Sequence, residues 1–335
     1  METGASFRTL RGAVLRSVSR SFYISVALLP KKLRDPVALA YLLARASDTI
    51  ADTTEIATDL RIDKLRSLAG AIQTGGTSDL MADLSASFAN LQREGSERSL
   101  IESLPLCFDW LDQLEPEDRT EIQAVLEKIN RGQLGDLDRF RDPGQVVALQ
   151  KSADLEEYTY LVAGSAGEFW TNLCFAHLRK FSRQPENEML GLGKTYGMGL
   201  QLINILRDAG KDLRAGRCYF PEEELAAARM EPAQILREPQ RFQSIYRDWR
   251  SKAESRVRSG IDYGCSIRNR RVRAATVLPA LIGARTLALV REAGATALHR
   301  QIKVARKEVR KIISRLLITL GSRSQIRELH YELSR

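Results

Sequence analysis

Asp48-Thr-Ile-Ala-Asp52 and Asp208-Ala-Gly-Lys-Asp212 are two short stretches that lie 160 residues apart in the chain. Each carries two aspartates four residues apart inside an apolar pattern with the period of an α-helix. Side chains at positions i and i+4 share one face of a helix, so each stretch predicts a pair of neighbouring carboxylates. Two such helices facing each other would form a four-carboxylate mouth suited to Mg²⁺ and a diphosphate, because Mg²⁺ prefers oxygen ligands and commonly takes substrate phosphate oxygens.

Spacing alone does not support a metal site, but the surroundings of these two pairs do. The same spacing occurs at Asp59/Asp63, Asp79/Asp83 and Asp138/Asp142, which we interpret as solvated helix faces. The first two stretches differ because a narrow polar stripe forms in each helix: Tyr41, Arg45, Asp48 and Asp52 in one, and Gln201, Asn204, Asp208 and Asp212 in the other. The other sides of both helices are apolar, which predicts burial. A buried stripe with two acids must be paired or must coordinate metal, so the pattern favours a metal site.

The composition favours helices almost throughout the chain. It has 335 residues, 44% of them hydrophobic, with only 10 prolines and 22 glycines. Alternating strand patterns joined by Asn-Gly or Asp-Gly turns do not occur, and no internal repeat or Gly/Ser/Pro linker divides the sequence. We therefore predict a single all-α domain that covers residues 1–335.

The apolar periodicity predicts the positions of the helices. They are expected near residues 6–19, 36–52, 58–73, 79–93, 98–112, 117–132, 152–178, 187–212, 222–236, 240–264, 270–292 and 303–318, with a short helix near the end. Pro36 suits the first turn of its helix, and Asp35 before it suits an N-cap.

Cysteine usage and hydropathy bear on the compartment. The four cysteines are scattered without a Cys-x-x-Cys motif, which argues against a zinc site or a disulfide framework. The first residues lack the basic-then-apolar layout of a signal peptide. The most apolar stretch, residues 274–290, is interrupted by Pro279, Gly283 and Arg285, so it falls short of the roughly 18 to 20 apolar residues of a spanning helix. We expect a cytoplasmic protein.

The net charge of +9 is unevenly distributed. Residues 241–335 carry 22 Lys/Arg against 7 Asp/Glu, or +15, which leaves −6 for the first 240 residues. A basic region can meet nucleic acid, anionic lipid or an anionic substrate, and a solvated surface is the simpler alternative. No recognition motif or stacking-aromatic pattern accompanies the charge, so we expect no nucleic-acid partner. We expect a monomer that associates peripherally with the inner face of the membrane.

Three further segments carry residues suited to phosphate or to an apolar chain. Ser19-Arg20-Ser21-Phe22 supplies hydroxyl and guanidinium donors for phosphate oxygens, although such clusters are commonly caps or surface. The segment 158–167 has glycines at i and i+3, which indicates either close helix packing or room for an apolar ligand tail beside a tyrosine. The segment 214–221 is a basic loop just beyond the second aspartate stretch, where a metal-bound diphosphate would need positive charge.

Taken together, these segments resemble the squalene/phytoene synthase family, the head-to-head prenyl transferases. The matching pieces are Ser19-Arg-Ser-Phe22, Tyr41-x-x-x-Arg45-x-x-Asp48-Thr-x-x-Asp52, Tyr158-x-x-x-Val-Ala-Gly164-x-x-Gly167, Gln201-Leu-Ile-Asn204-Ile-Leu-Arg207-Asp208-x-x-x-Asp212 and Arg217-x-Tyr219-x-Pro221. They occur in the family's order and spacing over roughly residues 15–290, and such an ordered set is far more specific than any one piece. The resemblance implies an all-α isoprenoid-synthase fold around a central cavity, with Mg²⁺ and two prenyl diphosphates.

The resemblance also assigns roles to individual residues. The metal positions fall on Asp48, Asp52, Asp208 and Asp212, with Asn204 near them. The substrate positions fall on Ser19, Arg20, Ser21, Phe22, Tyr41, Arg45, Tyr158, Gln201, Asn204, Arg207, Arg217 and Tyr219. Tyr158 is the expected catalytic tyrosine, acting with Arg45, Asp48 and Asp208. Family members commonly carry a glutamate where this chain has Ala51 and Lys211, which leaves the number of bound metals open.

The implied reaction is the Mg²⁺-dependent condensation of two farnesyl diphosphates through presqualene diphosphate to squalene, with reduction by NADPH. The stretch Gln301-Ile-Lys303-Val-Ala-Arg306-Lys307 resembles the basic segment that squalene synthases place near the nicotinamide cofactor, although Ala305 stands where an arginine is expected. Lys303 and Arg306 are the expected contacts to the cofactor's phosphate. A charged face on a terminal helix is the alternative interpretation of this stretch.

Other functions fit parts of the pattern. Dehydrosqualene or phytoene synthesis would use the same residues without the reduction. A terpene cyclase should show Asp-Asp-x-x-Asp in the first motif, where this chain has Thr49. A non-catalytic assembly or lipid-binding protein of the same fold would be favoured by loss of the motif aspartates, and all four are kept.

Overall fold

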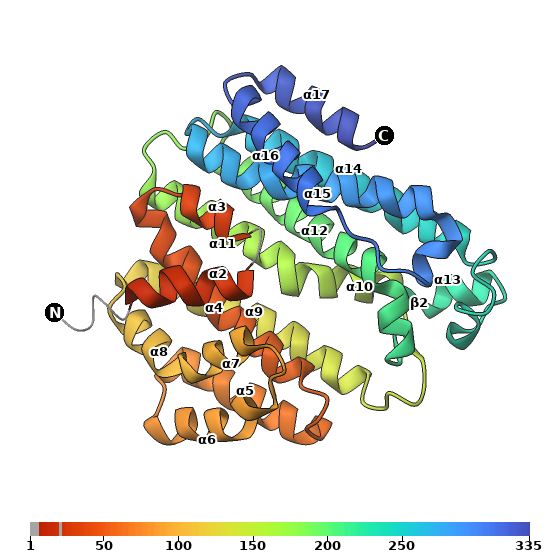
Figure 1. Cartoon of the computed structure of the whole chain (residues 1–335), viewed down its shortest axis with the longest axis horizontal. Helices are drawn as coiled ribbons and strands as arrows, with labels where there is room; N and C mark the ends of the chain where they lie inside the picture. Colours follow the sequence, from red (N-terminus) through yellow and green to blue (C-terminus); the bar gives the residue numbers. More distant parts are fainter. Residues whose placement is uncertain (1–6, 20–21) are drawn as a thin grey trace. The chain divides into compact units, whose positions relative to one another are not determined.

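A computed structural model of the chain describes residues 7–19 and 22–335, and Figure 1 shows that helices dominate it. Its contacts divide it into two compact units. Unit 1 comprises Met1–Arg139 and Asn172–His177, and unit 2 comprises Phe140–Thr171 and Leu178–Arg335. The predicted all-α class is confirmed, and the single domain over residues 1–335 stays a prediction.

Unit 1 contains the first of the two predicted aspartate helices. Its elements are η1 (Leu10–Val14), α2 (Leu15–Ser19), α3 (Phe22–Leu28), α4 (Lys31–Asp52), α5 (Thr58–Thr74), α6 (Ser78–Phe88), η2 (Ala89–Leu91), α7 (Gly95–Glu102), α8 (Leu104–Asp112) and α9 (Pro116–Arg139), with the end of α11. Helix α4 packs against α5, α7, α8 and α9. Leu39, Leu42 and Ile50 on α4 are fully buried, as the apolar sequence of this helix predicts.

The start of α4 differs from the prediction. The helix begins at Lys31 after Pro30, so Pro36 lies inside it and Asp35 is not its N-cap. Pro36 has no N–H to donate to the Lys32 carbonyl four residues earlier, so α4 lacks one hydrogen bond in its second turn. The Asp35 carboxylate instead accepts two hydrogen bonds of 2.9 Å from the Arg11 guanidinium.

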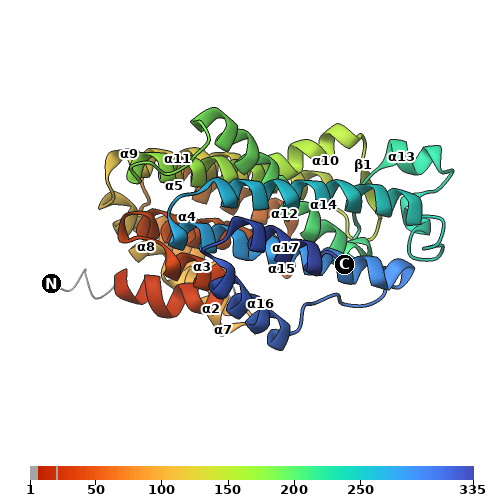
Figure 2. The ribbon, with the colours of Figure 1, turned by 90° about the horizontal axis from the view of Figure 1, so that it is seen from above.

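Unit 2 contains the second aspartate helix. Its elements are β1 (Val147–Leu149), α10 (Ser152–Thr159), η3 (Tyr160–Gly164), the first part of α11 (Ser165–His177), α12 (Glu186–Arg214), β2 (Arg217–Pro221), α13 (Glu222–Ala227), η4 (Pro232–Gln234), α14 (Gln243–Ser266), α15 (Arg270–Ala293), η5 (Gly294–Leu298), α16 (Arg306–Thr319) and α17 (Arg323–Leu333). Figures 1 and 2 show α12, α14 and α15 side by side. Two buried hydroxyls join them: Tyr246 donates to the Leu206 carbonyl at 2.6 Å, and Tyr196 donates to the Thr276 carbonyl at 2.9 Å.

Several elements depart from the sequence prediction. Helix α3 was not expected, α13 is shorter than the predicted 222–236, and α16 begins at Arg306 rather than at residue 303. The two short strands were not expected either, and they pair in parallel with a shift in register after Ala148. Strands of three and five residues carry too little alternation to be read from sequence.

The helix Arg270–Leu298 is the one helix in the described part of the chain that is long and apolar enough to cross a membrane. Of its most apolar window, 78% is buried inside the protein, as in a core helix. The helix is therefore weak evidence for a membrane span.

Candidate functional site

The first aspartate stripe runs along α4 and is more open than the sequence predicts. Tyr41, Arg45 and Asp48 are half-buried, and Asp52 is exposed, so the expectation of a fully buried stripe is wrong. The apolar sides of α4 are buried as predicted, but its polar side is left accessible to water. The Tyr41 ring packs against Phe22 with centroids 4.8 Å apart, and its hydroxyl donates to the Val18 carbonyl at 3.2 Å.

Arg45 connects this stripe to a neighbouring helix. Its guanidinium donates a hydrogen bond to Glu97 on α7, and a second nitrogen lies 3.8 Å from an Asp48 carboxylate oxygen. A planar guanidinium held by carboxylates keeps further donors for an incoming anion. Glu97 was not among the predicted site residues.

Asp48 is the most perturbed group of the stripe. Desolvation by the surrounding protein, together with the negative charge of Asp52, raises the pKa of Asp48 from 3.8 to about 7. The positive charge of Arg45 and a hydrogen bond from the Gln133 amide oppose this rise in pKa. Because 46% of the Asp48 side chain is exposed, water moderates the effect.

Gln133 is the second residue that sequence reasoning missed. It lies on α9, beyond residue 132 where the predicted helix ended, and it is buried. Asn130, one turn earlier, is also buried, and both of its side-chain polar atoms lack a partner among the described residues. Two amides at i and i+3, on the same side of the predicted helix as its apolar residues Leu126 and Ile129, were the available signal.

The second aspartate stripe lies on α12. The Arg207 guanidinium grips the Asp208 carboxylate through two hydrogen bonds, of 3.0 and 2.5 Å. The Asn204 amide donates to Gln201 at 3.3 Å, and Asn204 is exposed, whereas Asp208 and Asp212 are half-buried. Gln201, Asn204, Asp208 and Asp212 therefore share one side of α12, and Arg207 reaches Asp208 from beside this stripe.

The predicted tyrosine and the loop after α12 come together in unit 2. Tyr158 on α10 stacks on Tyr219 of β2 with ring centroids 5.0 Å apart, and their hydroxyl oxygens lie 3.5 Å apart. Phe140 meets the Tyr219 ring edge-on at 5.4 Å. Gly216, with φ of 81°, makes the turn that leads from α12 into β2 and its first residue, Arg217. The π-helical turn η3 begins two residues after Tyr158, and such turns occur frequently at functional sites.

The two glycines of the segment 158–167 support the packing interpretation. A Cβ atom on Gly167 would lie 2.0 Å from the Gly193 carbonyl oxygen of α12. A Cβ atom on Gly164 would lie 2.9 Å from Met198 of the same helix. The glycines therefore let the two helices approach closely, and no space for a ligand tail is needed to explain them.

The predicted cofactor segment, residues 301–307, follows η5, and η5 packs closely against α12. A Cβ atom on Gly210, between the two α12 aspartates, would lie 1.8 Å from the Leu298 carbonyl oxygen of η5. Beyond η5 the chain alternates, with Ile302 and Val304 buried and Lys303 exposed between them. Arg306 is exposed at the first position of α16.

The remaining predicted residues are placed as follows. Ser19 is buried, and its hydroxyl donates to the Leu15 carbonyl. Arg20 and Ser21 lie outside the described residues. Among residues 7–19 and 22–335, no cluster of three or more His, Cys, Asp or Glu side chains is placed to hold a metal ion. The metal and substrate roles of the predicted residues stay predictions.

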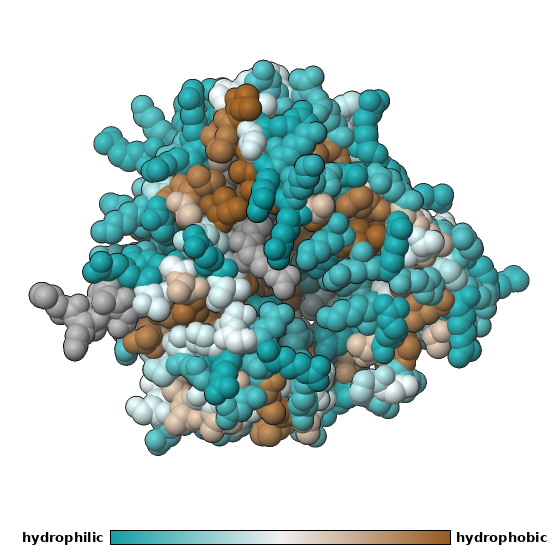
Figure 3. Space-filling model, viewed as in Figure 1, coloured by the Kyte–Doolittle hydropathy of each residue, from teal (hydrophilic) through white to brown (hydrophobic). Residues whose placement is uncertain are grey.

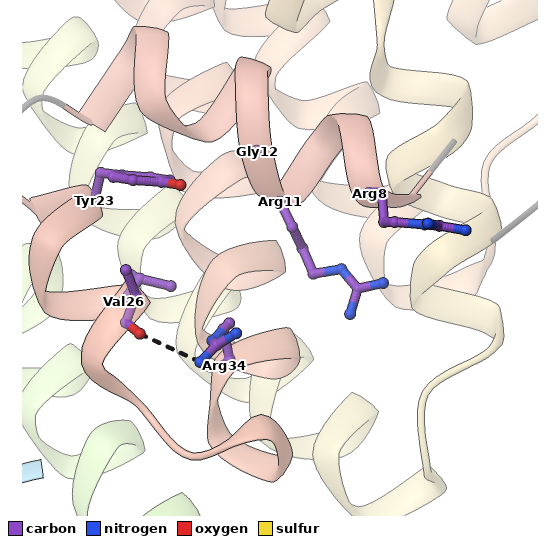
Figure 4. Close-up of a pocket in the computed structure, with 7 residues that line it drawn as sticks. Arg8, Arg11, Gly12, Tyr23, Val26 and Arg34 are labelled. Carbon is purple, nitrogen blue, oxygen red and sulfur yellow. Dashed lines mark hydrogen bonds between the residues drawn. The ribbon is translucent and has the colours of Figure 1, made fainter. Parts of the chain in front are cut away.

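Unit 1 also has a hollow of about 380 Å³ among η1, α3 and α4. Figure 4 shows Arg11, Tyr23 and Arg34 around it, with Arg8 at its margin. Arg34 donates to the Ala27 carbonyl at 3.2 Å and to the Leu29 carbonyl at 2.8 Å, while Arg11 is paired with Asp35. Of the predicted site residues that the structure describes, none lines this hollow, and the guanidinium groups of Arg11 and Arg34 hold the N-terminal helices together.

Comparison with known proteins identifies the family. The model of the squalene/phytoene synthase family matches residues 15–308. The squalene synthase of Saccharomyces cerevisiae is 30% identical over 211 residues, which are 63% of this chain and 44% of that protein. The bifunctional lycopene cyclase/phytoene synthase of Gibberella fujikuroi is 27% identical over 233 residues, which are 68% of this chain and 37% of that protein. The aligned region thus spans less than half the length of either relative.

The fold agrees with a solved structure. TcSQS in complex with a ligand superposes with a TM-score of 0.75 at 21% identity, covering 99% of this chain and 98% of that one. The all-α isoprenoid-synthase fold expected from the resemblance is therefore confirmed. Since the family model matches nearly the whole chain, the protein belongs to the squalene/phytoene synthase family.

Proposed function

We propose that the protein condenses two farnesyl diphosphates head to head, through presqualene diphosphate, to squalene, with reduction by NADPH. The observation that carries this proposal is the retention of all four motif aspartates on α4 and α12, in a chain that matches the family over residues 15–308. A non-catalytic relative would have no reason to keep them, since carboxylates that lie close together repel each other.

The residues present fit Mg²⁺. The motif side chains offer carboxylate oxygens, which are the ligands that Mg²⁺ prefers. Desolvation and the negative charge of Asp52 raise the pKa of Asp48, and a bound cation would offset both effects because it favours the charged carboxylate. Asp208 accepts two hydrogen bonds from Arg207, and a carboxylate has about four lone-pair sites, so it retains capacity for a metal. We propose Asp48, Asp52, Asp208 and Asp212 as the ligands, with Asn204 near them. Bound Mg²⁺ would supply charge neutralisation for the leaving diphosphate.

The chain's own residues would hold the diphosphates. They would also stabilise the allylic cation that forms when a diphosphate leaves its prenyl chain. Arg45 contacts Asp48 on α4, Arg207 contacts Asp208 on α12, and Arg217 begins β2 after the turn that ends α12. We propose these three for the diphosphates, because bidentate guanidinium donors suit phosphate oxygens. The paired rings of Phe22 and Tyr41 present π-faces that can stabilise a carbocation when bound substrate displaces water from them.

Presqualene diphosphate contains a cyclopropane ring, and a proton is lost when this ring closes. We propose that Tyr158 directs the loss of that proton. Its hydroxyl is within 3.5 Å of the Tyr219 hydroxyl, so the second tyrosine can orient the first and relay its proton.

Lys303 and Arg306 fit the phosphate end of NADPH. Both are exposed, and among the described residues no carboxylate pairs with either. NADPH would supply the hydride for the reduced product. Without it, the same residues would make dehydrosqualene or, from a longer prenyl diphosphate, phytoene. The similarity to a bifunctional lycopene cyclase/phytoene synthase supports phytoene as an alternative product.

We further propose that the protein associates reversibly with anionic membrane surfaces as a monomer and binds no nucleic acid. The support is the excess of 15 positive charges in residues 241–335 and the insolubility of the product in water. Such binding should weaken steeply with salt.

Product analysis by mass spectrometry tests the reaction. Incubation with farnesyl or geranylgeranyl diphosphate and Mg²⁺, with and without NADPH, should give squalene only from farnesyl diphosphate with NADPH. The same, more unsaturated hydrocarbon with and without NADPH would refute the reduction. No prenyl product in any incubation would refute the proposed prenyltransferase activity.

Variants test the aspartates. Asp208→Asn should lower turnover by about a hundredfold or more, because metal charge is used mainly in the transition state. Asp79→Asn is the matched control, since Asp79 is an exposed aspartate on α6 outside both stripes, and its activity should match the wild type.

A further inference from the structure

Helix α16 leaves two adjacent apolar side chains in water. Ile318 is 82% exposed and Leu317 is 56% exposed, and they are the two most exposed large aliphatic side chains in the described part of the chain. Figure 3 shows an apolar area at the upper edge of the view, over the end of α16 where it leads into α17 in Figure 1. Exposed aliphatic neighbours at a helix end are a marker of an interaction surface.

The rest of the outer face of α16 is basic. Ile312 and Leu316 point into the protein and are 2% exposed. At about 100° per residue, the half of the helix opposite to them has Arg306 at its edge and carries Lys307, Arg310, Lys311, Ser314, Leu317 and Ile318. The first two turns of this face are therefore cationic, and its last turn is apolar.

The three cations of this face are not used inside the protein. Lys307, Arg310 and Lys311 are exposed, and the described residues provide no ion pair for any of them. The neighbouring Arg315, by contrast, pairs with Glu332 of α17 at 2.5 Å. This ion pair lies off the outer face and fixes α16 against α17.

We propose that the outer face of α16, defined as Lys307, Arg310, Lys311, Leu317 and Ile318, docks on an anionic lipid surface. The cations would meet lipid phosphates, and the apolar tip would enter the boundary between headgroups and acyl chains. A lipid surface matches both halves of this face at once, because it offers negative charge beside hydrocarbon. The inference rests on the proposed membrane association but not on the proposed reaction.

Vesicle co-sedimentation of the full chain tests the proposal. The probes are vesicles of phosphatidylcholine alone and of an equal mixture of phosphatidylcholine and phosphatidylglycerol. Leu317→Gln with Ile318→Gln should weaken binding to the mixed vesicles about tenfold or more, because two aliphatic side chains no longer leave water. Lys307→Gln, Arg310→Gln and Lys311→Gln should each weaken it by roughly fivefold at low salt.

Leu60→Gln is the matched control, since Leu60 on α5 is 43% exposed and has no such basic face beside it. Its binding should equal that of the wild type. All variants should keep the wild-type melting temperature and the wild-type turnover of detergent-dispersed farnesyl diphosphate, which separates docking from folding and from the reaction.

The possible results divide cleanly. If the variant with Leu317→Gln and Ile318→Gln (the tip variant) binds the mixed vesicles as tightly as the wild type, this docking face is wrong, although membrane association itself stands. No binding of the wild type to the mixed vesicles would overturn both, whatever the turnover. If the tip variant instead converts a dimer to a monomer in sedimentation velocity, with vesicle binding unchanged, the face meets a second copy of the chain and the proposal is wrong.

Discussion

Replacing Gly167 by alanine distinguishes the two explanations of the paired glycines in the segment 158–167. If the glycines serve packing, the added methyl group collides with α12, because its Cβ would lie 2.0 Å from the Gly193 carbonyl oxygen and 2.5 Å from the carbonyl carbon. Ordinary contact begins near 3.4 Å, so the two backbones must separate by more than one ångström. The neighbour is main chain, so no flexible side chain can move aside.

The size of the effect follows from two opposing terms. Forcing an extra methyl group into a packed interface costs about 3 kcal/mol at the upper end of the usual range. Alanine recovers up to about 1 kcal/mol relative to glycine within a helix. The net loss is therefore about 2 kcal/mol, which lowers the melting temperature by roughly 4–8 °C in a unit of this size.

Gly191→Ala on α12 is the control, since a Cβ atom there meets nothing within 4 Å. It should raise the melting temperature by roughly 1–3 °C through helix propensity alone. Calorimetry on the ligand-free protein gives both values. If the glycines instead make room for a prenyl chain, Gly167→Ala would melt at or above the wild-type temperature without ligand and would show only a raised KM, which would refute the packing explanation.

Two further predictions concern Asp48. Its raised pKa means that the folded protein holds a proton that the unfolded chain has already released, so that stability is present at low pH and is lost as the pH rises from about 4 through about 7. Asp48→Asn should therefore melt above the metal-free wild type at pH 8 and show no such gain at pH 4, as calorimetry at the two pH values can check; an equal difference at both would contradict the assignment. Gln133→Leu removes a hydrogen bond that favours the charged carboxylate, so the acidic limb of the pH profile of kcat/KM should move to higher pH. An unmoved limb with a uniformly lower rate would show that Gln133 is only structural.

The buried sides of the helices were predictable because they rest on local periodicity. Apolar residues surround both stripes, and α4 and α12 are buried where those residues lie. Helix starts were less predictable, as α4 shows. Pro36 and Asp35 form a good local start signal, but Asp35 instead pairs with Arg11, which lies 24 residues earlier in the chain. A contact that distant leaves no trace in the pattern around the proline.

The short parallel strands illustrate a second limit. β2 follows the left-handed Gly216, which a Gly-containing loop does predict, but its partner β1 lies about 70 residues earlier. Pairing of such short segments depends on where the helices bring the chain, and no alternation in either sequence announces it. This pairing nonetheless fixes Tyr219, and through it the stacked Tyr158, so part of the candidate site depends on an element that periodicity could not predict.

The aspartate spacing predicted a pair of carboxylates on each helix, but spacing alone does not set their chemistry. On α4, desolvation and Asp52 raise the pKa of Asp48, and the hydrogen bond from Gln133 of α9 opposes that rise. Its guanidinium neighbour Arg45 is held by Glu97 from α7. On α12, the first aspartate is gripped by Arg207, the residue just before it. One pair is therefore tuned by residues from distant helices and the other by its own neighbour. Two motifs of the same spacing can for that reason bind metal at different pH and with different strength, and metal titrations of Asp48→Asn and Asp208→Asn as a function of pH would separate them.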